Sequence, residues 1–183
     1  MKPSDWLRRV EDRIARLLRP DTSTDPHQRR IDELRALGVR IGGGCWIHSS
    51  SFSTEPYLIE IGDRVGISSG VQFVTHEGGA WLLRGRHPNL QVFGRIRVGN
   101  DTIIGMGAVI LPGTTIGSDC IVGAGAVVKG RVPDGMVVVG NPARVLKSTE
   151  DHLRALEDSP NRLDVWHLDG AERERRIKAH FGI

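Results

Sequence analysis

Hydrophobic residues recur at every sixth position through the middle of the chain. Counting by six from Val98, each position is aliphatic: Val98, Ile104, Ile110, Ile116, Val122 and Val128. A period of six fits neither the 3.6-residue turn of an α-helix nor the simple alternation of an amphipathic strand. It is the spacing of a hexapeptide β-helix, in which each repeat supplies one short parallel strand and one turn. The pattern therefore predicts stacked coils over residues 98–133.

The positions between these aliphatic residues are small or turn-forming. Glycine follows the aliphatic residue in four of the six repeats, where we expect it to relieve the backbone as the chain turns between faces. Four positions after the aliphatic residue, nearly every side chain is small: Thr102, Ala108, Thr114, Cys120, Ala126 and Val132. The aliphatic side chains should stack in the interior, and the small ones should lie near the corners of each coil.

The same frame begins at Ile41 and is interrupted twice. It runs through Ile47, slips across residues 50–60 and resumes at Ile61. Such a slip indicates a bulge or an insertion in one coil. Between residues 75 and 95 the repeat is absent altogether. An excursion of this length inside a compact repeat is more often functional than structural.

Amphipathic helical patterns flank the repeats on both sides. We predict an all-β core over residues 41–146 with an inserted loop at 75–95, a helical N-terminal cap over 1–40 and a helical C-terminal tail over 147–183. The cap should hold one helix near residues 4–18 and a second beginning at Pro26. The first of these carries five arginines. Contact with a membrane surface is therefore an alternative to its predicted role of covering the open end of the coils.

Composition excludes several classes of protein. The net charge is only +3, from 25 basic and 22 acidic side chains, which argues against a dedicated nucleic-acid-binding protein. Cys45 and Cys120 both fall at small-residue positions of the frame, so we interpret them as small hydrophobic residues in a reducing compartment. No apolar run resembles a signal peptide or a membrane span. We expect a cytoplasmic protein with no nucleic-acid partner and no integral membrane segment.

His76 is the candidate catalytic residue. It stands where a regular strand gives way to the long excursion, between Thr75 and Glu77. A histidine at such a place is accessible to solvent and held on a rigid scaffold, and an imidazole suits the role of general base at neutral pH. An ordinary loop histidine is the alternative reading of the same position.

Sequence motifs inside the frame resemble a known family. Together with LPGTTIG, VGAGAVV and GNPARV, the repeat is similar to that of the left-handed β-helix hexapeptide acyltransferases over residues 41–146. Within that superfamily, EPYLIEIG, ISSGVQFVTHEGG and FGRIRVGN resemble the sugar and polysaccharide O-acetyltransferases, relatives of galactoside, maltose and xenobiotic acetyltransferases. The resemblance implies left-handed coils, a homotrimer, and acetyl-CoA bound along the cleft between subunits.

The resemblance also implies a mechanism and a catalytic base. The base of the family falls on His76, which would take the proton of an acceptor hydroxyl as that hydroxyl attacks the thioester directly. Glu55 is expected to orient the imidazole, although it could instead help the chain turn at Pro56. In the excursion, candidates for contacts with the acceptor are Trp81, Arg84, Arg86 and His87, each of which could equally be a packing residue.

Two turns and three cations are candidates for binding the coenzyme. The small or flexible residues that would let pantetheine lie against backbone amides are Gly105, Met106, Gly107, Ala124 and Gly125. The family places cations near the adenine and the 3′-phosphate, and one of these positions matches Arg144. The other departs from the family pattern, because the expected Thr-Lys pair is replaced by Lys129 and Gly130, with Arg131 next. Phosphate needs cations but not one fixed register, so Lys129, Arg131 and Arg144 remain the predicted contacts.

The favoured function is acetyl-CoA-dependent O-acetylation of a sugar or glycan precursor. N-acetylation of a nucleotide-linked amino sugar and O-acetylation of an antibiotic use the same chemistry and remain alternatives. A zinc carbonic anhydrase on the same fold is disfavoured, because His48, His76 and His87 lack the close pairing that its metal site needs, and we expect no metal. A non-catalytic scaffold is disfavoured because it has no need of the excursion.

Overall fold

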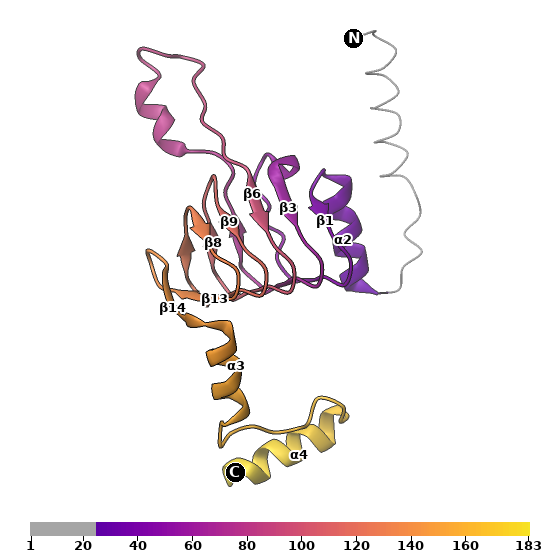
Figure 1. Cartoon of the computed structure of the whole chain (residues 1–183). Helices are drawn as coiled ribbons and strands as arrows, with labels where there is room; N and C mark the ends of the chain where they lie inside the picture. Colours follow the sequence, from indigo (N-terminus) through magenta and orange to yellow (C-terminus); the bar gives the residue numbers. More distant parts are fainter. Residues whose placement is uncertain (1–24) are drawn as a thin grey trace. The chain divides into compact units, whose positions relative to one another are not determined.

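Three sheets of short strands form the core of the computed structural model, which describes residues 25–183 (Figure 1). Sheet A contains β1 (Arg40–Ile41), β3 (Ile59–Ile61), β6 (Ile96–Val98), β9 (Thr115–Ile116) and β12 (Arg131–Val132). Sheet B contains β2 (Trp46–Ile47), β4 (Gly66–Ile67), β7 (Ile103–Ile104), β10 (Ile121–Val122), β13 (Met136–Val139) and β14 (Arg144–Ser148). Sheet C contains β5 (Gln72–Phe73), β8 (Val109–Ile110) and β11 (Val127–Val128).

The chain visits sheets A, B and C in turn, so successive passages stack as coils. In sheet A, Ile61 pairs with Val98, and Val98 pairs with Ile116. In sheet B, Ile104 pairs with Val122 in the next coil. The pairings between successive coils are parallel, whereas β14 turns back antiparallel to β13. This arrangement fits the parallel β-helix predicted from the six-residue period.

The interior is filled by the residues that the period selects. The six in-frame aliphatic side chains from Val98 to Val128 are each at most 3% exposed. The small residues four positions later are also buried, and Cys120 is only 1% exposed. Cys45, at the same position of an earlier coil, is half-buried. Burial of both sets confirms the predicted stacked core.

The glycine after each aliphatic residue is required for a different reason from the one we expected. A Cβ atom on Gly99 would lie 2.5 Å from the backbone nitrogen of Ser118 in the next coil. The left-handed backbone conformations occur elsewhere in the turns, for example at Asp119 (φ 55°) and Gly125 (φ 68°). Close approach of neighbouring coils, and not relief of the backbone, therefore selects glycine at this position.

Among the described residues, helices precede and follow the coils along the chain. Helix α2 (Pro26–Ala36) begins after Asp25, whose side chain accepts a hydrogen bond from the backbone N–H of His27. Its Ile31 and Leu34 are buried in the same core as the coils. The predicted helix near residues 4–18 lies outside the described residues, and so does its possible contact with a membrane.

The C-terminal residues 150–183 make a second compact unit. It contains most of α3 (Thr149–Glu157) and all of α4 (Gly170–Phe181). Asp169 caps α4 as predicted, because its carboxylate accepts a hydrogen bond from the backbone N–H of Glu172 at 2.9 Å. None of the helices in residues 25–183 is both long and apolar enough to cross a membrane.

Two segments interrupt the coils. The slip at residues 50–60 contains the 3₁₀ helix η1 (Pro56–Leu58), and the excursion contains a second one, η2 (Gly78–Leu83). In Figure 1 the excursion is the magenta loop that leaves the coils just before β6. Each segment leaves its coil after the passage through sheet C. The two interruptions therefore lie next to each other, one in each of two adjacent coils.

Replacing Gly99 with alanine should destabilise the protein by about 1–3 kcal/mol, because the added methyl group collides with the backbone of the next coil. Gly85→Ala is the matched control, since no atom lies within 4 Å of a Cβ built on Gly85. The control should be neutral or slightly stabilising. Urea denaturation of both variants measures the difference. Equal losses in the two would contradict the coil-contact explanation.

Candidate active site

His76 lies at the neck of the excursion, where the chain leaves and re-enters the coils. It forms an antiparallel bridge with Phe93 on the returning limb. The backbone N–H of Glu77 donates to the carbonyl of Val92 at 2.9 Å, and the N–H of Gly94 donates to the carbonyl of Thr75 at 2.8 Å. These bonds close the neck and hold the backbone of His76 against the rigid coils.

Glu55 reaches His76 from the preceding coil. Its Oε2 atom lies 3.0 Å from Nδ1 of the imidazole. The side chain of Glu55 is 16% exposed and that of His76 is 45% exposed. The carboxylate is therefore sheltered beneath the ring, while the ring itself remains open to solvent. The structure thus brings together the two residues that the sequence proposed as base and orienting group.

Two threonines fix the carboxylate of Glu55. Thr54 donates its hydroxyl to Oε1 at 2.6 Å, and Thr75 donates its hydroxyl to Oε2 at 2.6 Å. These two bonds, followed by the interaction with His76, lower the pKa of Glu55 to about 2 against the opposing effect of partial burial. Glu55 is consequently ionised at neutral pH. Sequence reasoning did not identify either threonine.

The hydrogen-bond network around Glu55 extends through Thr75 to Ser53. Thr75 is fully buried, and its Oγ1 lies 2.7 Å from Oγ of Ser53. Since the single hydroxyl proton of Thr75 goes to a carboxylate that can only accept, Ser53 must donate to Thr75. Ser53 in turn accepts the backbone N–H of Thr75 at 3.2 Å. These hydrogen bonds hold the hydroxyl of Thr75 in place and so fix the position of the Glu55 carboxylate.

The carboxylate also selects the tautomer of His76. An ionised carboxylate can only accept a hydrogen bond, so Nδ1 of His76 must carry the proton. Nε2 then holds the free lone pair of the neutral ring, and it has no hydrogen-bond partner within residues 25–183. The assignment follows from the hydrogen-bond network. An imidazole in this state is ready to accept a proton at Nε2.

A pocket of about 300 Å³ opens beside His76. Trp81 and Arg84 line it, together with Glu55 and His76. His87 is not part of the lining. A further wall, missed from the sequence, consists of Leu90, Gln91, Val92 and Phe93. The apolar residues of LQVF, just before the frame resumes, were the available signal for this wall.

The two predicted coenzyme turns are stacked in adjacent coils. Both join sheet B to sheet C, and the backbone N–H of Gly125 donates to the carbonyl of Met106 at 2.8 Å. A Cβ atom on Gly105 would lie 2.6 Å from the nitrogen of Ala124. The N–H groups of Met106 and Ala124 have no acceptor among the described residues. The turns therefore present a smooth backbone surface with donors available to a ligand.

The three predicted cations do not form one group. Lys129 lies in the turn after β11. Arg144 begins β14 and donates to the carbonyl of Ala143 at 2.9 Å, while the N–H of Ala143 donates to Val127 of β11 at 2.9 Å. Lys129 and Arg144 thus both lie beside β11, the edge strand of sheet C. Arg131 instead belongs to β12 of sheet A.

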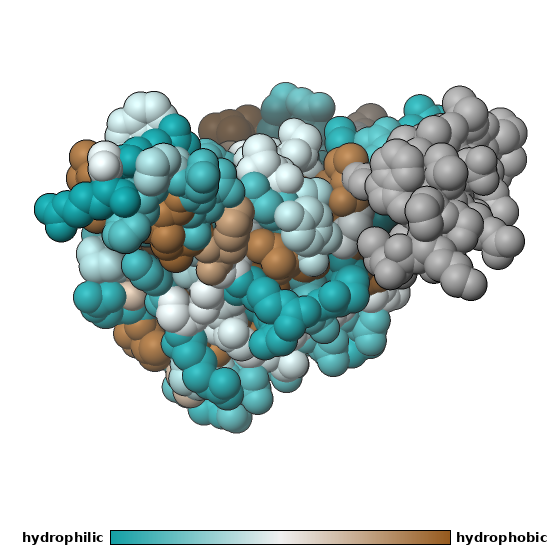
Figure 2. All heavy atoms as spheres, turned by 90° about the horizontal axis from the view of Figure 1, so that it is seen from above, coloured by the Kyte–Doolittle hydropathy of each residue, from teal (hydrophilic) through white to brown (hydrophobic). Residues whose placement is uncertain are grey.

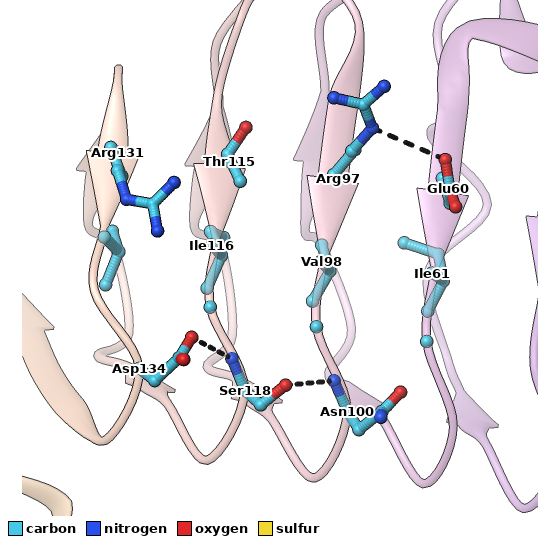
Figure 3. A pocket seen from close by; sticks show the side chains of 14 residues that line it. Glu60, Ile61, Arg97, Val98, Asn100, Thr115, Ile116, Ser118, Arg131 and Asp134 are labelled. Atoms are coloured by element: carbon cyan, nitrogen blue, oxygen red, sulfur yellow. Dashed lines mark hydrogen bonds and ion pairs between the residues drawn. The ribbon is translucent and has the colours of Figure 1, made fainter.

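Arg131 lines a second groove, of about 370 Å³, on sheet A. Figure 3 shows it beside Thr115, in line with Arg97 and Glu60. Glu60 accepts a hydrogen bond from Arg40 at 2.6 Å and lies 3.5 Å from Arg97, and the Arg40 bond is the main cause of its lowered pKa. This groove is larger than the pocket at His76 but is lined by no histidine.

The acidic groups of the sheet A groove already tie strands and turns together. Besides Glu60, the groove contains Asp134, whose carboxylate accepts the backbone N–H of Ser118 at 3.0 Å (Figure 3). Within residues 25–183 there is also no cluster of three or more His, Cys, Asp or Glu side chains that could hold a metal ion. Chemistry, rather than size, therefore favours the pocket at His76 as the active site.

Comparison with known proteins agrees with the hexapeptide-repeat fold. The family model described as "Bacterial transferase hexapeptide (six repeats)" matches residues 95–130. The chain is 52% identical over 122 residues to Protein CapG of Staphylococcus aureus, an alignment that covers 65% of this chain and 71% of that protein.

Solved structures share the architecture. A maltose O-acetyltransferase from Clostridium difficile 630 superposes with a TM-score of 0.52 at 28% identity, covering 76% of this chain and 87% of that one. A galactoside acetyltransferase in complex with coenzyme A superposes with a TM-score of 0.54, covering 84% of this chain and 86% of that one. Its identity of 20% limits the likeness to the fold.

The ionisation of Glu55 should be visible in the pH dependence of stability. A lowered pKa in the folded state contributes stability that is complete above the ordinary value of 4.5 and is lost as pH falls toward about 2. Glu55→Gln removes this titration. The difference in urea midpoint between the wild type and Glu55→Gln should therefore be constant from pH 7 to about pH 6 and shrink toward pH 3. An equal difference at pH 7 and pH 3 would contradict the assignment.

Proposed function

Because the chain belongs to the hexapeptide-repeat family of bacterial transferases, we propose that it transfers an acetyl group from acetyl-CoA to a hydroxyl of a sugar or glycan precursor. The observation that carries this proposal is the hydrogen-bonded pair of Glu55 and His76 at the edge of a pocket. The similarity to a maltose O-acetyltransferase supports a sugar hydroxyl as the acceptor.

His76 acts as the general base in the proposed reaction. Its Nε2 takes the proton of the acceptor hydroxyl while the acceptor oxygen attacks the carbonyl carbon of the thioester. The tetrahedral intermediate collapses, the C–S bond breaks, and the sulfur leaves as the thiol of CoA after taking a proton from His76. Glu55 remains ionised throughout and stabilises the imidazolium at Nδ1. General-base assistance of this kind contributes about 10²- to 10⁴-fold in rate.

The two cysteines are poor nucleophiles, which supports direct transfer without an acyl-enzyme. Cys120 is buried, and burial raises the pKa of its thiol. The thiol of Cys45 donates to the carbonyl of Gly62 at 3.1 Å in a corner of the coil. Neither side chain lines the pocket at His76.

Acetyl-CoA is proposed to lie along the stacked turns between sheets B and C. The residues fit this group, because glycine and alanine leave the backbone open and the N–H groups of Met106 and Ala124 can bond to the amides of pantetheine. Lys129 and Arg144 beside β11 supply positive charge for the phosphates. The galactoside acetyltransferase of the same fold is solved with coenzyme A.

We propose a homotrimer of left-handed coils as the working assembly. His76 follows sheet C in the chain, whereas the turns that would bind pantetheine precede sheet C. The base and the coenzyme turns of one chain therefore lie at opposite edges of the same sheet. A neighbouring subunit that presents its turns to His76 would complete the site.

Replacing His76 with alanine should lower acceptor-dependent thiol release from acetyl-CoA by at least about 100-fold, in keeping with loss of a general base. Binding of CoA, measured by calorimetry, should be unchanged. His180→Ala, in exposed α4, is the matched control and should keep its rate. Retained activity in His76→Ala would remove the base from the proposal.

The coenzyme contacts can be separated by a second pair of variants. Lys129→Gln and Arg144→Gln should each raise KM for acetyl-CoA by about tenfold, equivalent to loss of about 1.4 kcal/mol from a charge-assisted bond. Arg131→Gln should change KM less, because Arg131 lies on sheet A. Initial rates at varied acetyl-CoA measure all three. A larger effect at Arg131 would move the phosphates to the sheet A groove.

A further inference from the structure

Arg84 places a positive charge in the pocket of the proposed base. The central carbon of its guanidinium lies 4.2 Å from the ring centroid of Trp81. Both residues line the pocket that contains His76. The ion pairs found within residues 25–183 do not include Arg84. Its guanidinium is therefore a cation without an acidic partner in that part of the chain.

The acidic groups of the same pocket have other partners. Glu55 is bonded to two threonines and to His76. Glu77 accepts the backbone N–H of Gly79 at 3.0 Å and so caps the start of η2. A guanidinium carries five N–H donors in a planar fork that matches a carboxylate or a phosphate. Those of Arg84 remain available to a ligand.

Trp81 positions this guanidinium. The two residues are three apart, and in a 3₁₀ helix side chains at that spacing eclipse one another. The backbone N–H of Arg84 also donates to the carbonyl of Trp81 at 3.2 Å. Because Trp81 is itself 67% exposed, the stack forms without a buried core around it. One face of the indole is therefore occupied by Arg84, and that face is not available as a platform for a sugar ring.

The wall formed by Leu90, Gln91, Val92 and Phe93 is largely apolar. Leu90 is half-buried, whereas Val92 and Phe93 are 47% and 48% exposed. Figure 2 shows hydrophobic side chains lying directly beside hydrophilic ones on the surface seen from above the coils. This pocket would offer a ligand both these apolar side chains and the guanidinium of Arg84. Its volume of about 300 Å³ suits a single sugar residue with one substituent.

We propose that the acceptor carries an anionic group, a carboxylate or a phosphate, which Arg84 binds while the reacting hydroxyl lies at His76. This inference rests on the proposed acetyl transfer to a sugar. An anionic substituent exchanges water for charge-assisted bonds to the guanidinium, whereas a neutral sugar leaves Arg84 hydrated. Arg84 is then the residue that determines specificity, and Trp81 is a positioning residue that acts through it.

Three acceptors of matched ring structure test the proposal: glucose, glucuronate and glucose 6-phosphate. The wild type should acetylate the anionic sugars with kcat/KM at least about tenfold above that for glucose, the size expected for one charge-assisted contact. Arg84→Gln should abolish this preference, and Arg84→Lys should keep part of it. Arg86→Gln is the matched control, since Arg86 is a neighbouring arginine that does not line the pocket. It should keep the full preference.

A second pair of variants examines Trp81. Trp81→Leu should reduce the preference by raising KM for the anionic sugars more than it lowers kcat. Trp81→Phe should retain most of it, because phenylalanine still offers an aromatic face to the guanidinium. Added salt should weaken the preference in the wild type and have little effect in Arg84→Gln.

Each outcome decides the proposal. Preference for glucuronate alone or for glucose 6-phosphate alone assigns the anion as carboxylate or phosphate, and loss of either preference in Arg84→Gln supports the inference. Equal rates with glucose and both anionic sugars, or a preference that survives Arg84→Gln, would overturn it while leaving the transferase intact. If no sugar releases thiol, the proposed function fails separately. In that case, calorimetry on the same three sugars tests the inference. It is supported if the wild type binds the anionic sugars more tightly than glucose and Arg84→Gln removes this difference. It is overturned if the wild type binds all three sugars equally.

Discussion

The distance between successive coils is the constraint on which the structure depends. Hydrogen bonds between parallel strands hold neighbouring coils about 4.8 Å apart, which leaves little room for a side chain between turns. Gly99 shows the consequence, since even a methyl group there would meet the backbone of Ser118. The same spacing lets turn side chains bond to the coil below: Asn100 accepts from the N–H of Asp63, Ser118 from Asn100, and Asp134 from Ser118.

A frame bonded in this way can position irregular segments accurately. Glu55 comes from the slip in one coil and His76 from the neck of the excursion in the next. The two coils are joined at the base of these segments by the parallel bridge between Ser51 and Gln72. Thr75 extends the ordered interior up to the carboxylate, because its buried hydroxyl bonds to Glu55. The departures from the repeat thus bring Glu55 and His76 together at one place beside the coils.

The regular part of the fold was predictable because one six-residue pattern recurs. In each repeat, the same position has the same buried or turn environment. Val98 and Ile104 needed only their spacing to be placed in the interior. His76 was singled out by its position at the end of the pattern and by resemblance to a family, and Glu55 was expected to lie one coil away from it. The contacts of Thr54 and Thr75 with Glu55, and the wall formed by Leu90–Phe93, depend on how the excursion folds back. The excursion has no periodic sequence pattern from which its path back to the coils could be predicted.

The same reasoning explains why specificity should reside in the excursion. Coil positions are constrained by their neighbours above and below, so a change that suits a new acceptor would disturb the stack. The excursion is free of this constraint, and a six-residue 3₁₀ helix suffices to set Arg84 over Trp81 in the pocket of His76. In the proposed reaction, Glu55 and His76 are held by the coils and can serve any hydroxyl that reaches them. An acceptor preference can therefore change through residues 78–93 while the proposed base and its orienting carboxylate stay the same.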